Sequence, residues 1–265
     1  MSGFPSEWLA LREPVDLAAR NGNVETAFFA ALPGKKVKLL DLASGKGSTV
    51  AALSGKLGRA QEWILTDNDP VLLNAARARY ADFGEGNVTC RQFDLSAELQ
   101  ALPFDQVDAV TTSAFLDLVT RPFLEDLVSL IVEARVPFLA SLTYDGRAVC
   151  VPADPLDEEI RLAMNTHQKT DKGFGPALGP EAADIAISLF QSKGYRVVSG
   201  PSDWHSGPGT AAFQTELVTG WISAAREMGV DREQLARWSG IRADQIAQGI
   251  LSLTVGHLDF AALPA

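Results

Sequence analysis

The sequence predicts an α/β protein in which helices cover both faces of a largely parallel sheet. Short apolar runs alternate with helical patterns along residues 35–143, and the first run ends in the Gly-rich turn 43–47. Strands that alternate with helices in this way are joined by right-handed βαβ crossovers. These observations predict a Rossmann-like, three-layer αβα sandwich, formed by residues 1–265 as a single domain.

The elements are expected in a definite order along the chain. Residues 1–34 should form an N-terminal helical cap, with a break at 21–23 and an end at Pro33-Gly34. Helices should begin at Asp69-Pro70, because Asp is a good N-cap and Pro a good first residue, and should also cover 49–57 and 123–132. Residues 35–143 form the expected cofactor-binding core, whose apolar runs predict strands at 37–42, 63–67, 87–93, 107–112 and 136–143.

After Tyr144 the apolar periodicity weakens. Residues 145–180 are rich in Asp, Gly and Pro, and we expect them to form a lid or substrate insertion after the fifth strand. A helix should follow at 181–193 and a sixth strand at 195–199. A helical insertion is expected at 207–249 and a last strand at 251–263.

Composition excludes several classes of protein. The chain has 265 residues and a formal net charge of -10, which argues against nucleic acid as the main partner because a phosphate backbone needs a basic surface. Two cysteines are too few for a disulfide framework or a cysteine zinc site. No apolar run approaches the roughly 18 residues of a membrane helix, and charged residues stand where a signal peptide would be apolar. We therefore expect a soluble, cytoplasmic protein. The sequence does not determine its oligomeric state.

The strongest signal is the turn Asp41-Leu42-Ala43-Ser44-Gly45-Lys46-Gly47 between the first strand and the first helix. Small residues there let a ligand approach the backbone, and the helix N-terminus offers free N–H groups. A dinucleotide fingerprint fails because Val50 occupies the third Gly position. A P-loop fails because Gly47 follows Lys46 and Leu40 stands where its first Gly should be. What remains is an acidic residue followed by small residues at alternate positions.

With this turn, the chain resembles the class I S-adenosylmethionine-dependent methyltransferases, whose first motif is usually [DE]-x-G-x-G-x-G. Ala43 replaces the first Gly of that motif. The later landmarks of the family also stand at expected strand ends, as Asp67-Asn68, Asp94-Leu95 and Ser113 within 110–115. The resemblance covers residues 37–143 closely. It implies a mixed seven-stranded sheet whose sixth and last strands lie together at one edge, the last one antiparallel.

The resemblance implies S-adenosyl-L-methionine as cofactor and S-adenosyl-L-homocysteine as product. Asp67 would bind both ribose hydroxyls, Asp94 would face the adenine amino group, and Arg20 or Arg12 of the cap would meet the cofactor carboxylate. Because a sulfonium methyl is already activated, catalysis is mainly positioning for in-line displacement. The predicted cofactor-binding residues are Arg20, Asp41, Ala43, Ser44, Gly45, Gly47, Asp67, Asn68, Asp94, Leu95 and Ser113.

The acceptor is predicted to be a small molecule whose reacting atom the sequence does not name. Relatives that methylate base amines carry [DN]-P-P-[YF] where this chain has residues 112–115. Those acting on cytosine C5 use Pro-Cys, whereas Thr89 precedes Cys90 and Val149 precedes Cys150. The segment 165–176 is the best candidate for acceptor contact, and an exposed polar loop is the alternative.

If a general base exists, we expect it to be His167, because imidazole titrates near neutrality. Asp171, four residues on, would orient the ring, and Tyr144 would share the acceptor's proton. Proximity alone, without a base, is the alternative. A metal shared by His167 and Asp171 is not favoured, and no metal is expected.

Two other functions stay open. Ala43 and the lack of a clearly identified base are compatible with a catalytically inactive protein that binds S-adenosylmethionine. Residues 231–249 have the residue spacing of a helix-turn-helix, with the small Ala236 in a first helix, Gly240 in a turn and the aliphatic Ile246 in a second helix. Such a motif would indicate a DNA-binding regulator. This stretch has no net charge, and a plain helical hairpin with Leu235, Trp238 and Ile246 in the core is the favoured interpretation.

Overall fold

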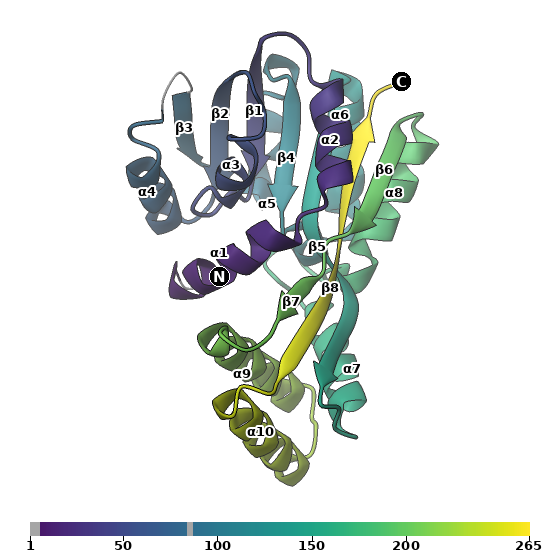
Figure 1. Cartoon of the computed structure of the whole chain (residues 1–265). Helices are drawn as coiled ribbons and strands as arrows, with labels where there is room; N and C mark the ends of the chain where they lie inside the picture. Colours follow the sequence, from purple (N-terminus) through teal and green to yellow (C-terminus); the bar gives the residue numbers. More distant parts are fainter. Residues whose placement is uncertain (1–5, 84–86) are drawn as a thin grey trace.

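A mixed sheet runs through the whole molecule (Figure 1). The computed structural model describes residues 6–83 and 87–265, so the first five residues of the predicted cap lie outside it. The strand order is β3-β2-β1-β4-β5-β8-β6, and β7 pairs with β8 beside this path. The strands are β1 (Lys36–Leu42), β2 (Ala60–Asp67), β3 (Asn87–Gln92), β4 (Ala109–Ser113), β5 (Phe138–Val151), β6 (Arg196–Pro201), β7 (Trp204–Ser206) and β8 (Ser252–Leu263).

The predicted fold class is confirmed. Strands β1 to β5 pair in parallel, and β8 lies antiparallel between β5 and β6, as the last strand was expected to do. The described part of the sheet has eight strands rather than seven, because the short β7 adds to β8.

Helices cover both faces of this sheet. They are α1 (Ser6–Ala19), α2 (Gly22–Ala31), α3 (Ser48–Leu53), α4 (Pro70–Arg79), α5 (Leu95–Glu98), α6 (Arg121–Ala134), α7 (Asp157–Gln168), α8 (Ala182–Ser192), α9 (Ala211–Glu227) and α10 (Arg232–Ala247). The side chains of β1 contribute to the core on each face of the sheet, because successive side chains of a strand point to opposite faces. Val37 and Leu39 pack in the core beneath α2 and α3, whereas Leu40 and Leu42 pack beneath α6 and α8.

The long strands β5 and β8 continue, paired with each other, beyond the ends of the neighbouring parallel strands. This extension carries a second apolar core. The sequence predicted the end of the fifth strand at residue 143, but β5 continues to Val151 through two register shifts. At the first shift Leu142 has a φ of 56°, and its N–H donates to Asp259 Oδ1 at 2.7 Å. Helices α7, α9 and α10 pack around this extension (Figure 1), where Trp221 and Trp238 are buried.

The loose lid predicted for 145–180 is therefore corrected. Its first residues are strand, and α7 follows, with Ile160, Ala163 and Met164 buried at helical spacing. The many acidic residues of α7 lie on its other positions and obscured this pattern in the sequence. Only residues 169–178, here called the lid loop, keep the expected irregular structure between α7 and the short 3₁₀ turn at Gly179–Glu181.

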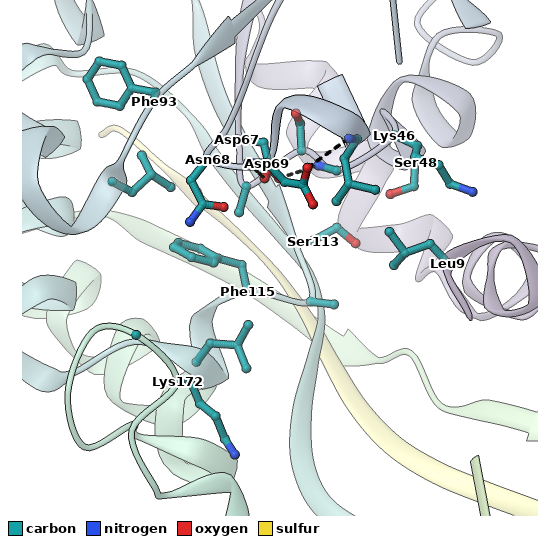
Figure 2. Close-up of a pocket in the computed structure, with 18 of the residues that line it drawn as sticks. Leu9, Lys46, Ser48, Asp67, Asn68, Asp69, Phe93, Ser113, Phe115 and Lys172 are labelled. Carbon is teal, nitrogen blue, oxygen red and sulfur yellow. Dashed lines mark hydrogen bonds between the residues drawn. The ribbon is translucent and has the colours of Figure 1, made fainter. Parts of the chain in front are cut away.

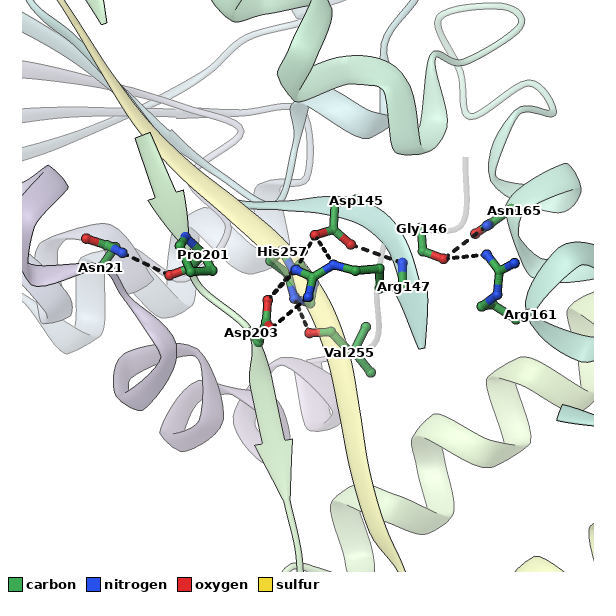
Figure 3. Close-up of polar contacts among 10 residues, drawn as sticks. All are labelled: Asn21, Asp145, Gly146, Arg147, Arg161, Asn165, Pro201, Asp203, Val255 and His257. Atoms are coloured by element: carbon green, nitrogen blue, oxygen red, sulfur yellow. Dashed lines mark hydrogen bonds and ion pairs between the residues drawn. The ribbon is translucent and has the colours of Figure 1, made fainter. Parts of the chain in front are cut away.

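Polar contacts fix the second β5 bend against α7 and the segment before β7 (Figure 3). Arg147 donates to Asp203 Oδ1 at 2.7 Å and to Asp145 Oδ2 through its Nε at 2.8 Å. The carbonyl of Gly146 accepts from Arg161 at 3.0 Å and from Asn165 at 3.1 Å. These bonds set the direction in which α7 leaves the sheet and hence where the lid loop begins.

The helix-turn-helix interpretation of 231–249 is wrong. Helix α10 runs without interruption from Arg232 to Ala247, so Gly240 lies inside a helix and not in a turn. The hairpin is formed by α9 and α10 together, not within this stretch. Leu235 and Trp238 are buried, as expected for core positions, whereas Ile246 is only half-buried against this core. No helix in the described residues is long and apolar enough to cross a membrane.

Candidate active site

A cavity of about 920 Å³ lies at the carboxyl ends of the parallel strands (Figure 2). Its walls are α1, the turn after β1, the ends of β2 and β4, the residues after β3, and the lid loop. Ligands of open α/β sheets bind at this edge. Figure 2 shows Asp67 and Asn68 facing this space, with Leu9 of α1 on one side and Lys172 of the lid loop on another.

The structure brings most predicted site residues to this cavity. Those that line it are Ala43, Ser44, Gly45, Asp67, Asn68, Asp94, Leu95, Ser113 and Asp171. Arg20, Asp41, Gly47, Tyr144 and His167 are not lining residues. Their contacts with a cofactor or acceptor stay predictions, but four separate strand ends do converge on one space.

The Gly-rich turn depends on left-handed backbone at three alternate positions. Ala43, Gly45 and Gly47 have φ values of 50°, 53° and 78°. A Cβ on Gly47 would lie 2.5 Å from the Tyr80 ring, whose hydroxyl donates to the Gly47 carbonyl at 2.6 Å. Gly is therefore required at 47, whereas Ala43 holds a conformation that disfavours any side chain.

Replacing Ala43 by Gly should stabilise the protein. Ala in the left-handed region costs about 1–2 kcal/mol, and the extra unfolded-state entropy of Gly offsets part of the gain, so Ala43→Gly should raise the free energy of unfolding by about 0.5–1 kcal/mol. Urea unfolding measures the change. Ala51→Gly inside α3 is the control and should lower it by about 1 kcal/mol. A destabilised Ala43→Gly variant would show that the turn is not strained.

Asp67 ties the turn to the end of β2. Its Oδ2 accepts the Gly45 N–H at 2.8 Å, and its Oδ1 accepts the Asp69 N–H at 2.9 Å. The side chain is nearly buried, and burial raises its pKa. Asp69 in turn caps α4 by accepting from Val71 at 2.7 Å. The carboxylate thus orders the backbone that a ligand at this edge would meet.

Asp41 lies beneath the turn and is completely buried. Thr111 of β4 donates to its Oδ1 at 2.7 Å, while its Oδ2 has no hydrogen-bond partner. Burial raises the pKa of Asp41 to about 7. Asp41 therefore organises the floor of the site between β1 and β4.

The raised pKa of Asp41 makes stability depend on pH. Between its ordinary pKa of 3.8 and about 7, the folded chain binds the Asp41 proton more tightly than the unfolded chain does. Protonated Asp41 therefore stabilises the folded state relative to its ionised form. This contribution to the free energy of unfolding is complete below about pH 4 and is lost as pH rises towards 7. The free energy of unfolding of Asp41→Asn, measured in urea, should therefore rise relative to wild type from about pH 4 to about pH 7. A pH-independent difference would contradict this assignment.

Two arginines of the cap occupy different positions. Arg12 lines the cavity, donates to Asp16 at 2.9 Å, and lies 5.0 Å from the Trp204 ring centroid. Arg20 is buried just after α1 and donates through Nη2 to Ser113 at 3.2 Å. Its Nε and Nη1 have no hydrogen-bond partner. Arg20 therefore offers two unused donors next to a residue of the cavity wall.

Each predicted catalytic residue has hydrogen-bond partners other than the remaining two. His167 Nε2 is 3.1 Å from Glu227 on α9, and its Nδ1 is 3.3 Å from the Lys172 amine. Asp171 accepts from Gly173 and Gly175 of its own loop, at 2.6 and 2.9 Å. Both His167 nitrogens thus have partners other than Asp171.

Tyr144 is also turned away from the cavity wall. Its hydroxyl donates to Asn165 Oδ1 at 2.8 Å, and burial raises its pKa far above the usual range. Tyr144 is therefore a neutral donor at ordinary pH.

Aromatic and charged lining residues lie in the two segments expected at the acceptor end, 110–115 and 165–176, although they were not singled out as site residues. Phe115 and Phe174 line the cavity with ring centroids 5.6 Å apart, and Phe123 packs 4.9 Å from Phe174. Lys172 lines it too, and burial lowers its pKa. Phe115 is the last residue of the fourth landmark, 110–115, which was the available signal. Among the described residues no three His, Cys, Asp or Glu side chains gather to hold a metal ion, and the predicted lack of a metal stays a prediction.

Comparisons with known proteins agree with this geometry. Residues 39–136 match a family described as "Methyltransferase domain". Ribosomal RNA small subunit methyltransferase H of Acidithiobacillus ferrooxidans is 34% identical over 96 residues, which are 34% of this chain and 30% of that protein. The chain thus matches less than a third of this curated relative's length.

Two solved structures show the same fold. A cyclopropane-fatty-acyl-phospholipid synthase-like protein from Lactobacillus casei has a TM-score of 0.58 at 13% identity, over 97% of this chain and 92% of its own. A SAM-dependent methyltransferase from Thiobacillus denitrificans, in complex with S-adenosyl-L-homocysteine, has a TM-score of 0.50 at 15% identity, over 99% of both chains.

The fold and its strand-end cavity define a Rossmann-like methyltransferase. Residues 39–136 match a methyltransferase family, and the chain has the Rossmann-like fold of class I S-adenosylmethionine-dependent methyltransferases, whose cofactor is S-adenosylmethionine. The resemblance recognised in the sequence is confirmed.

Proposed function

We propose that this protein transfers the methyl group of S-adenosylmethionine to a small molecule. The observation that carries the proposal is the convergence of the turn after β1, Asp67 and Asp94 on one cavity that the lid loop also lines. When bound, the cofactor supplies an activated methyl on a sulfonium, so the chain's own task is mainly to orient the reactants and exclude water.

The residues present fit this cofactor. Asp67 would hold the ribose hydroxyls, and Asn68 and Asp94 would lie beside the adenine. Arg20 has two nitrogens without a hydrogen-bond partner, Nε and Nη1, and a guanidinium donor suits a carboxylate, the group at the amino-acid end of the cofactor. Ser113, already bound to Arg20 Nη2, would keep the guanidinium in place.

The acceptor is proposed to be small because both the chain and the site have an excess of acidic groups. The chain carries a net charge of -10, and the cavity is lined by six acidic residues, Glu13, Asp16, Asp67, Asp69, Asp94 and Asp171, against three basic ones, Arg12, Lys46 and Lys172. A polynucleotide would be repelled by this surface.

Labelled cofactor tests the proposal directly. Calorimetry should show binding of S-adenosylhomocysteine, and incubation with methyl-labelled S-adenosylmethionine should label a low-molecular-weight fraction of a cell extract. An RNA fraction treated in parallel is the comparison. Binding without any labelled product would favour an inactive cofactor-binding protein, and label confined to RNA would overturn the small-molecule acceptor.

A further inference from the structure

The lid loop presents one aromatic side chain to the cavity. Phe174 lies between Gly173 and Gly175, whose φ values are 102° and 100°. Such backbone favours glycine, and a Cβ on Gly175 would also lie 3.3 Å from Thr120 Cγ2. Phe174 itself is half-buried and lines the cavity. The two glycines therefore set the direction in which this ring points.

Asp171 holds the loop in this conformation. Its Oδ1 accepts the N–H groups of Gly173 at 2.6 Å and of Gly175 at 2.9 Å. The far end of the loop is fixed as well, because the Leu178 N–H donates to the Val119 carbonyl at 2.8 Å. Asp171 therefore orders the backbone on both sides of the Phe174 ring.

Phe174 meets the aromatic residues that follow β4. Its ring centroid lies 5.6 Å from that of Phe115 at an interplanar angle of 71°, and 4.9 Å from that of Phe123 at 69°. Phe115 also lines the cavity, and in the view of Figure 2 its ring lies between Asn68 and Lys172. Two cavity-lining rings at a wide angle form a corner, in which a flat ring can stack on one and meet the edge of the other.

Other residues of the wall fit an apolar occupant of this corner. Further apolar lining residues come from α1 and from the segment after β4: Leu9, Ala114 and Leu118. The Lys172 amine bonds to Thr170 and His167, neither of which lines the cavity. Covering such a wall with an apolar group removes its surface from water, which favours binding.

We propose that the acceptor carries a planar aromatic ring and that Phe174 is the specificity-determining residue that binds this ring against Phe115. This rests on the proposed methyl transfer and names the class of its acceptor. Asp171 is then a positioning residue, because it acts on the acceptor through Phe174.

Two matched alcohols test the recognition of a flat ring. Benzyl alcohol and cyclohexylmethanol have the same carbon skeleton, but only the first has a planar ring. In titrations followed by ligand-observed NMR with S-adenosylhomocysteine bound, wild type should bind benzyl alcohol at least about threefold more tightly. Phe174→Leu keeps an apolar side chain without the flat ring and should abolish this preference. Phe29→Ala removes a half-buried ring of α2 that does not line the cavity, and this control should keep the preference.

Turnover gives the second readout. A metabolite extract is separated on a reversed-phase column, and methyl-labelled cofactor should label compounds of the retained fraction that contain an aromatic ring. With the purified acceptor, Phe174→Ala should raise KM at least about tenfold, while kcat and the affinity for S-adenosylhomocysteine stay within about threefold. Thermal unfolding checks that each variant folds.

Variants of Asp171 test its positioning role. Asp171→Ala should raise KM for the acceptor as Phe174→Ala does, because the N–H groups of Gly173 and Gly175 lose their acceptor. Asp171→Asn should restore KM, since an amide oxygen still accepts these two hydrogen bonds. An Asp171→Ala variant with an unchanged KM would contradict this role.

The outcomes separate the two proposals. No binding of S-adenosylhomocysteine to wild type would overturn the proposed function itself. Equal affinity of wild type for the two alcohols, or label confined to the unretained fraction, would overturn the aromatic acceptor. A Phe174→Ala variant with an unchanged KM would overturn the assignment of Phe174.

Discussion

Asp157→Ala should lower the free energy of unfolding by about 3–5 kcal/mol, because it leaves a fully buried arginine without its counter-ion. Arg242 of α10 is 0% exposed and contacts Asp157 at the start of α7. It also donates to the Pro152 carbonyl at 2.7 Å, and its guanidinium carbon lies 5.1 Å from the Trp238 ring centroid. Trp238 Nε1 donates to the same Asp157 oxygen at 2.7 Å. One carboxylate thus joins α7 to α10.

Urea unfolding of three variants tests this. Arg242→Met should cost less than Asp157→Ala, since Asp157 keeps its bond to Trp238 and is partly exposed. Arg237→Met, one and a half turns earlier on α10, removes an exposed partner of Asp154 and should change stability little. Equal losses in Asp157→Ala and Arg237→Met would show that burial of the ion pair has no effect on its strength.

The cofactor side of the site could be predicted because its residues directly follow apolar runs in the sequence. The turn 43–47, Asp67 and Asp94 each follow an apolar run directly, and parallel strands bring their carboxyl ends to one edge. Local sequence and topology together therefore placed most cofactor-side residues on the cavity wall.

The acceptor side could not be predicted in this way. Tyr144 was expected at a strand end, but β5 continues past it, and its hydroxyl binds Asn165 of α7. His167 was placed in a loop, but it lies in the last turn of α7, facing Glu227 of α9, sixty residues away. Such contacts depend on how α7 and α9 pack, which no local pattern contains.

The cofactor end of the site gives the second large effect. Asp67→Ala should weaken binding of S-adenosylhomocysteine by about 2–3 kcal/mol, because charge-assisted hydrogen bonds to the ribose hydroxyls are lost. Asp67 also accepts the Gly45 and Asp69 N–H groups, so part of any loss comes from a disordered turn. Calorimetry with one ligand does not separate these two contributions.

A double-mutant cycle does separate them. The second change is made in the ligand, by using the 2′-deoxy analogue of S-adenosylhomocysteine, which lacks one ribose hydroxyl. If Asp67 binds that hydroxyl, the analogue should bind wild type more weakly than S-adenosylhomocysteine does, and Asp67→Ala should bind both alike. A coupling near zero would mean that Asp67 acts only by holding the turn between β1 and α3. Ser96→Ala, which removes a hydroxyl that donates to Asp94 at 2.6 Å, is the control and should leave the penalty for the missing 2′-hydroxyl unchanged.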